Sequence, residues 1–227
     1  MLYIDPGYLF FVFPALILAM YAQFKVQATY QQFSRVHNSG GYSALLVART
    51  LLNDAGLENI PIERVAGRMT DHYDPRNRVL RLSEGTINST SVAALGIAAH
   101  EVGHAIQHEN GYIPLRLRNT IYPVANLGSR MAIPLFVIGL IFNSGFLMEV
   151  GIMFFGFAFL FQLVTLPVEF NASRRADRLL TAGGYLTYAE ADGSRKVLKA
   201  AALTYVAGTI MALAQLLRLV MLAGRRD

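Results

Sequence analysis

The chain contains four apolar stretches, and each is long enough to cross a membrane as a helix. They cover roughly residues 7–24, 131–148, 151–168 and 203–223. A helix needs about 20 residues to cross about 30 Å of hydrocarbon. Only a short turn near residues 143–149 separates the second stretch from the third, which predicts a helical hairpin. We therefore expect a mainly α integral membrane protein with about four transmembrane helices.

The segment between the first two spans has the pattern of a small α+β portion. Residues 28–58 have helical spacing, with Gly56 as the stop. Residues 60–67 and 78–83 alternate apolar and polar positions around a turn-rich segment, so we predict that these two runs form one β-hairpin. An Ala-rich helix follows, and the candidates for its N-terminal cap are Ser89, Thr90 and Ser91.

The composition agrees with a membrane protein and limits the possible chemistry. Hydrophobic residues make up 54% of the 227 residues and charged residues only 15%, against about 25% charged in soluble domains. The chain has no cysteine, which excludes disulfides, thiolate metal sites and thiol nucleophiles. Any bound metal must therefore be held by imidazole and carboxylate groups.

The distribution of lysine and arginine predicts the orientation in the membrane. These residues lie mainly in residues 25–130 and 171–199, whereas the turn between the second and third spans has none. The positive-inside rule then places both long loops in the cytoplasm and both termini outside, although Arg225 and Arg226 argue against this arrangement. The net charge of +5 is explained by this topology, and no nucleic-acid partner is expected.

These patterns predict five consecutive parts. The first span lacks a basic region before it and a small-residue cleavage site, so it is expected to stay as an anchor. The predicted parts are an N-terminal transmembrane anchor (1–24), a cytoplasmic zincin-like catalytic portion (25–130), a transmembrane hairpin (131–168), a cytoplasmic segment (169–200) and a C-terminal transmembrane helix (201–227).

The segment AAHEVGHAIQH (98–108) contains an H-E-x-x-H motif. His100 and His104 are four residues apart, so on a helix they share a face and can bind one zinc ion. Glu101 projects close to that face and can take a proton from a zinc-activated water that attacks a carbonyl. The motif predicts metal-assisted amide hydrolysis with Glu101 as general base. The alternative is a helix whose histidines are satisfied by hydrogen bonds, but burying Glu101 there without a partner would be costly.

A catalytic zinc needs a third protein ligand and one open position. His108 lies about 12 Å along the helix from His100, so one straight helix cannot bring both to one ion, and we expect His108 at the surface or behind the ligands. Glu169 ends the third span on the predicted cytoplasmic side, where a carboxylate so near hydrocarbon indicates a functional site. The alternative for Glu169 is an ion pair with a nearby arginine. Two further candidates without supporting spacing are His37 and His72.

Several long stretches resemble the bacterial membrane zinc metallopeptidases of the YugP type, which are neutral zinc metallopeptidases. These stretches are HEVGHAIQ, PLRLR (114–118), FQLVTLPVEFNASRRA and AALTYVA (201–207), and the resemblance covers nearly the whole chain. HtpX-type and CAAX prenyl proteases are more distantly similar. In HtpX-like relatives the third ligand is the glutamate of E-x-x-A-D, so the resemblance implies Glu169. Ser173 stands in place of the relatives' aspartate, whose supporting role could instead fall to Asp177, one turn further on.

Further residues are candidates for completing the site. Residues 78–83 are a candidate edge strand for an extended peptide substrate; the alternative is an ordinary hairpin strand that packs on the motif helix. Candidates for stabilising an oxyanion are Tyr112, Arg174 and Arg175. The cluster of Arg174, Arg175 and Arg178 is also typical of positive charge beside anionic membrane lipid.

We therefore expect a multi-pass zinc endopeptidase of the plasma membrane that hydrolyses peptide bonds near the cytoplasmic surface. The expected cofactor is Zn²⁺, and the expected partners are peptide or protein substrates and membrane lipid. The resemblance to HtpX-type proteases alone implies membrane-protein quality control. An alternative is a non-catalytic membrane scaffold with a vestigial or structural zinc site. Transport is disfavoured, because the spans carry few polar residues at their middle.

Overall fold

The computed structural model of the chain describes residues 6–224, which form two compact units. Within the described residues, unit 1 consists of 6–23, 113–167 and 203–224, and unit 2 of 24–112 and 168–202. Arg225 and Arg226, which bear on the predicted orientation, lie outside the described residues. The division into cytoplasmic and membrane parts stays a prediction.

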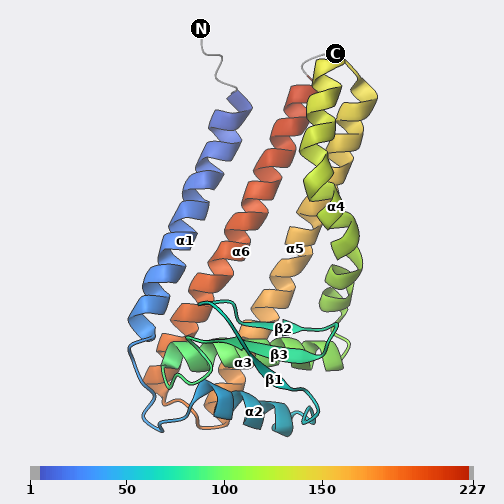
Figure 1. The fold of residues 1–227 in the computed structure, drawn as a ribbon. Helices are drawn as coiled ribbons and strands as arrows, with labels where there is room; N and C mark the ends of the chain where they lie inside the picture. Colours follow the sequence, from blue (N-terminus) through green and yellow to red (C-terminus); the bar gives the residue numbers. More distant parts are fainter. Residues whose placement is uncertain (1–5, 225–227) are drawn as a thin grey trace. The chain divides into compact units, whose positions relative to one another are not determined.

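Four helical segments among the described residues are long and apolar enough to cross a membrane (Figure 1). The first joins a short π-helix, η1 (Tyr8–Val12), to α1 (Phe13–Phe33). The others are α4 (Ile113–Ile141), α5 (Gly145–Ala182) and α6 (Tyr188–Ala223). The prediction of a mainly α membrane protein with four spans is thereby confirmed.

The predicted ends of the second span were wrong. α4 begins at Ile113, well before residue 131, and ends at Ile141, so Met148 belongs to α5. Arginines early in α4 interrupt the apolar pattern without ending the helix, because exposed arginine is a good helix former. The turn itself is tight: Asn143 has a φ of 52°, a left-handed conformation that asparagine tolerates better than most residues.

The predicted helix over residues 28–58 is two helices. α1 ends at Phe33, and α2 (Ala44–Asp54) starts after Ser43, whose side chain caps it. Asn38 holds the connection between the helices, because its side-chain amide donates to the carbonyls of Tyr42 and Thr90. The predicted stop at Gly56 agrees with its φ of 71° just beyond α2.

α3 (Val92–Glu109) lies at the core of unit 2. Its small apolar residues are almost entirely buried, which the uncharged Ala-rich sequence predicts. Ser91 caps its start and accepts a hydrogen bond from the Ala94 N–H at 3.2 Å, so one of the three predicted caps is confirmed. The H-E-x-x-H motif is therefore carried by a strongly buried helix.

The predicted hairpin between residues 60–67 and 78–83 was wrong in its pairing. β1 (Ile62–Val65) and β3 (Val79–Ser83) are parallel, and the antiparallel partner of β3 is β2 (His72–Asp74). β3 is therefore the middle strand (Figure 1), not the predicted edge for a substrate. The three residues of β2 lie in the segment interpreted as a turn, where they are too few to display alternation.

Candidate metal centre

Three side chains from α3 and α5 converge within unit 2. The Nε2 atoms of His100 and His104 are 3.1 Å apart. The Oε2 atom of Glu169 lies 3.3 Å from Nε2 of His100 and 3.6 Å from Nε2 of His104. With zinc bonds of about 2.0–2.1 Å, the ligand atoms of a tetrahedral site are about 3.3 Å apart. Both the spacing and the donor set of two imidazoles and one carboxylate therefore fit zinc.

The three side chains differ in their access to solvent in a way that suits an open site. Glu169 is 3% exposed, whereas His100 and His104 keep 14% and 12% of their side-chain surface accessible. A catalytic zinc needs a position for water or substrate beside its protein ligands. The partial exposure of the two imidazoles allows such access.

The outer nitrogen of each imidazole has its own partner. Nδ1 of His104 lies 3.0 Å from Oε1 of the fully buried Gln107. The Gln107 amide is oriented by its other end, where Nε2 donates to the carbonyl of Val168 at 2.9 Å. Oε1 can then only accept, so Nδ1 of His104 carries the hydrogen and Nε2 presents its lone pair to the centre. Nδ1 of His100 lies 3.1 Å from the hydroxyl of Ser173.

A glycine allows α3 and α5 to approach so closely. A Cβ atom on Gly103 would lie 2.9 Å from the carbonyl oxygen of Ala172 and 3.3 Å from its Cα. Backbone atoms cannot move aside as a flexible side chain can, so alanine at this position would push the helices apart. Gly103 and Ala172, which make this close contact, directly precede His104 on α3 and Ser173 on α5 in the sequence.

Glu101 is buried beside the three convergent side chains. Its Oε2 accepts a hydrogen bond from the backbone N–H of Tyr73 on β2 at 2.9 Å. Burial alone lowers the pKa of His104, but the carboxylates of Glu169 and Glu101 outweigh this effect and raise the pKa above its ordinary value. The centre therefore favours positive charge, as a cation site should.

The other candidate residues have different partners. His108 is half-buried and lies 2.9 Å from the Tyr73 hydroxyl through its Nδ1. His37 and His72 are exposed, with hydrogen bonds to Thr90 and to the backbone of Thr70. Asp177 accepts from the Arg195 guanidinium at 2.6 Å. Of the two residues considered for support behind the ligands, the structure therefore places Ser173, and not Asp177, against a histidine.

Two residues at the centre, Gln107 and Tyr73, were not predicted from the sequence. Gln107 follows His104 by three residues, a spacing that puts both on one helix face, so this signal was present in the motif segment. Tyr73 gave no comparable signal, because it lies in the turn-rich segment that proved to contain β2. Its contact with Glu101 depends on tertiary packing.

Comparison with known proteins gives matches that cover almost the whole chain. The family model described as "Putative neutral zinc metallopeptidase" matches residues 8–224. The chain is 46% identical over 215 residues to "Putative membrane protease YugP" of Bacillus subtilis (strain 168), which covers 95% of this chain and 96% of that protein. No solved structure gives a significant match.

Proposed function

The chain belongs to the family described as "Putative neutral zinc metallopeptidase", and from this premise we propose that it is a membrane zinc endopeptidase. His100, His104 and Glu169 would hold the zinc, and Glu101 would act as general base. The observation that carries the proposal is the convergence of two Nε2 atoms and one carboxylate oxygen at tetrahedral spacing. The Nδ1 partners support it, because they leave both Nε2 atoms available to a metal.

Glu101 has the position and environment that proton transfer requires. When bound, zinc lowers the pKa of a water molecule and polarises the carbonyl of a substrate. The Tyr73 N–H holds Oε2 of Glu101, which leaves Oε1 to accept the proton of the attacking water. The same carboxyl group can then deliver that proton to the departing amine.

β2 is the strand best placed to bind an extended substrate. It lies at the edge of the sheet, and its Tyr73 contacts the general base directly. An edge strand can pair with a peptide through main-chain hydrogen bonds without selecting particular side chains. We infer that the substrate is an extended or unfolded segment lying along β2.

The proposed reaction takes place near the cytoplasmic surface of the plasma membrane. Four apolar helices support membrane insertion, and the positive-inside rule supports a cytoplasmic position for residues 25–130. Unfolded segments of membrane proteins would then be natural substrates, and quality control of such proteins would be the cellular role.

Metal removal tests the activity. We expect the purified full-length chain in neutral detergent to cleave fluorescein-labelled casein, an unfolded substrate. 1,10-Phenanthroline should abolish cleavage, and added Zn²⁺, but not Mg²⁺, should restore it, because imidazole ligands favour zinc over magnesium. Zinc binding without any cleavage would contradict the proposal and support a non-catalytic scaffold.

Gln107→Leu is expected to weaken zinc binding about 10–100-fold, the usual cost of losing a residue that orients a metal ligand. Leucine removes the acceptor for the His104 Nδ1–H and leaves the Val168 carbonyl without its donor. Competition with a zinc-binding dye measures the affinity. Gln162→Leu on α5 is the control and should bind zinc normally. Equal affinity in both variants would remove Gln107 from the site.

A further inference from the structure

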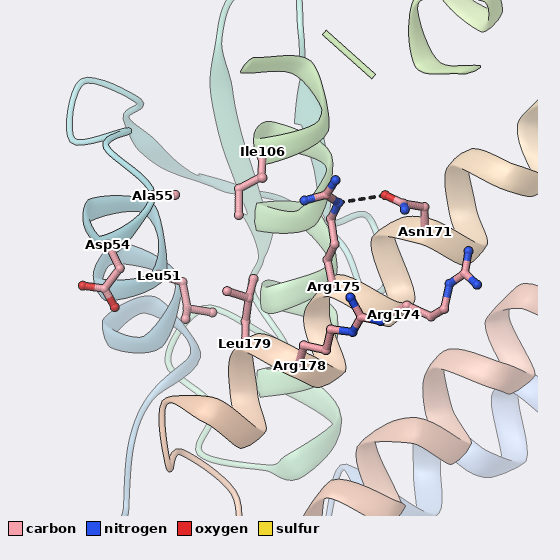
Figure 2. Close-up of a pocket in the computed structure, with 9 residues that line it drawn as sticks. All are labelled: Leu51, Asp54, Ala55, Ile106, Asn171, Arg174, Arg175, Arg178 and Leu179. Carbon is pink, nitrogen blue, oxygen red and sulfur yellow. Dashed lines mark hydrogen bonds between the residues drawn. The ribbon is translucent and has the colours of Figure 1, made fainter. Parts of the chain in front are cut away.

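A pocket with a volume of about 470 Å³ lies in unit 2 between α2, α3 and α5 (Figure 2). Its lining includes none of His100, His104 and Glu169. On α5 the residues that line it lie on a different face from Glu169 and Ser173, given a rotation of about 100° per residue. The pocket is therefore separate from the candidate metal centre.

Three arginines of α5 give the pocket its positive charge. Arg174 and Arg178 are exposed and one turn apart, and Arg175 lies between them in the sequence. Within the described part of the chain, none of the three has a carboxylate partner within ion-pair distance. Asp54 lines the pocket from α2, but does not pair with them. Like charges one turn apart repel each other, so a bound anion would stabilise this arrangement.

Arg175 differs from Arg174 and Arg178 because its guanidinium already donates a hydrogen bond within the protein. Its Nε donates to Oδ1 of Asn171 at 2.8 Å, the contact drawn in Figure 2. Asn171 Oδ1 also accepts from Nε2 of Gln107, whose other end contacts His104. Arg175 thus supports Gln107, which orients the candidate metal ligand His104. Arg174 and Arg178 remain as the two arginines of the pocket that are not part of this hydrogen-bond chain.

Apolar side chains form another part of the wall, beside Asp54 and Asn171. Leu51 comes from α2, Ile106 from α3 and Leu179 from α5 (Figure 2). A ligand that satisfies the whole pocket therefore has an anionic group joined to an apolar body. Guanidinium groups match phosphate oxygens in geometry, with paired N–H donors, and several arginines suit a group with several charged oxygens.

We propose that this pocket binds a phosphate group, carried by an anionic phospholipid or by a soluble phosphate ester. Arg174 and Arg178 bind the phosphate oxygens, and Leu51, Ile106 and Leu179 contact the apolar part of the ligand. The proposal does not depend on the peptidase activity, because none of these five side chains belongs to the candidate metal centre.

The test compares three probes on the full-length, zinc-loaded chain in neutral detergent. The probes are dioctanoyl phosphatidylglycerol, glycerol phosphate and dioctanoylglycerol, which lacks the phosphate. Thermophoresis measures each dissociation constant. The test variant is Arg174→Gln with Arg178→Gln, and the control, with the same charge change, is Arg68→Gln with Arg76→Gln, both exposed residues elsewhere in unit 2.

We expect phosphatidylglycerol to bind the wild type and the control equally, and the test variant at least tenfold more weakly. Glycerol phosphate binding as tightly as the lipid identifies a soluble ligand; weaker binding identifies a phospholipid. Three results would overturn the proposal. Dioctanoylglycerol could bind as tightly as phosphatidylglycerol, the two double variants could lose the same affinity for phosphatidylglycerol, or neither phosphate probe could bind. If the double variant does not fold, the exposed single variant Arg178→Gln replaces it, with a threefold or greater loss expected.

Discussion

Glu101→Gln is expected to lower the kcat of peptide hydrolysis by about 10²–10⁴-fold, the usual contribution of a general base. The amide has almost the same shape as the carboxylate but cannot accept the proton. Its oxygen can still accept the Tyr73 N–H that now binds Glu101 at 2.9 Å, so the position of β2 is preserved. Zinc content and KM should therefore change little.

Cleavage of labelled casein and zinc content are measured on the same preparation of this variant. Glu109→Gln is a suitable control, because Glu109 ends the same helix and its exposed carboxylate pairs with Arg78. The control should retain full activity. If Glu101→Gln hydrolysed casein at the wild-type rate, Glu101 would not be the base, and the reaction would need another proton acceptor.

Glu169→Gln should weaken zinc binding by at least about 100-fold, more than the roughly 10–100-fold cost of losing a supporting residue. The substitution replaces a buried charged ligand by a neutral amide and leaves two neutral imidazoles. It also removes the negative charge that raises the pKa of His104. Activity should fall with zinc occupancy and recover only in part at high zinc concentration.

Competition with a zinc-binding dye gives the affinity of the Glu169 variant. Glu149→Gln is the matched control, since Glu149 is an exposed carboxylate on the same helix. The control should bind zinc as the wild type does. Wild-type affinity in Glu169→Gln would remove this residue from the ligand set, and the third ligand would have to be sought elsewhere.

Features set by local periodicity were predictable from the sequence. The four spans follow from long apolar runs, and the pairing of His100 with His104 follows from the helical repeat. The resemblance to YugP-type metallopeptidases is confirmed by the family match. The residues behind each of these predictions lie close together in the chain or in long stretches that resemble the family.

Features set by packing between distant segments were predicted poorly. Alternation marked residues 60–67 and 78–83 as strands, but it contains no information on direction or partner, and they proved to be parallel. The contact between Glu101 and Tyr73 was not foreseen for the same reason. The approach of Glu169 to the histidines lies between these cases. Charge-based topology and family resemblance indicated it. The close contact at Gly103 that permits it depends on the packing of α3 against α5, which the sequence did not reveal.

The most direct test of a zinc site at His100, His104 and Glu169 is the metal content of the purified wild-type chain, measured by inductively coupled plasma mass spectrometry beside the His100→Ala variant. The expected result is about one zinc per wild-type chain and little zinc in the variant. A wild-type chain that takes up no zinc when the ion is supplied, or a variant that retains a full equivalent, would contradict it.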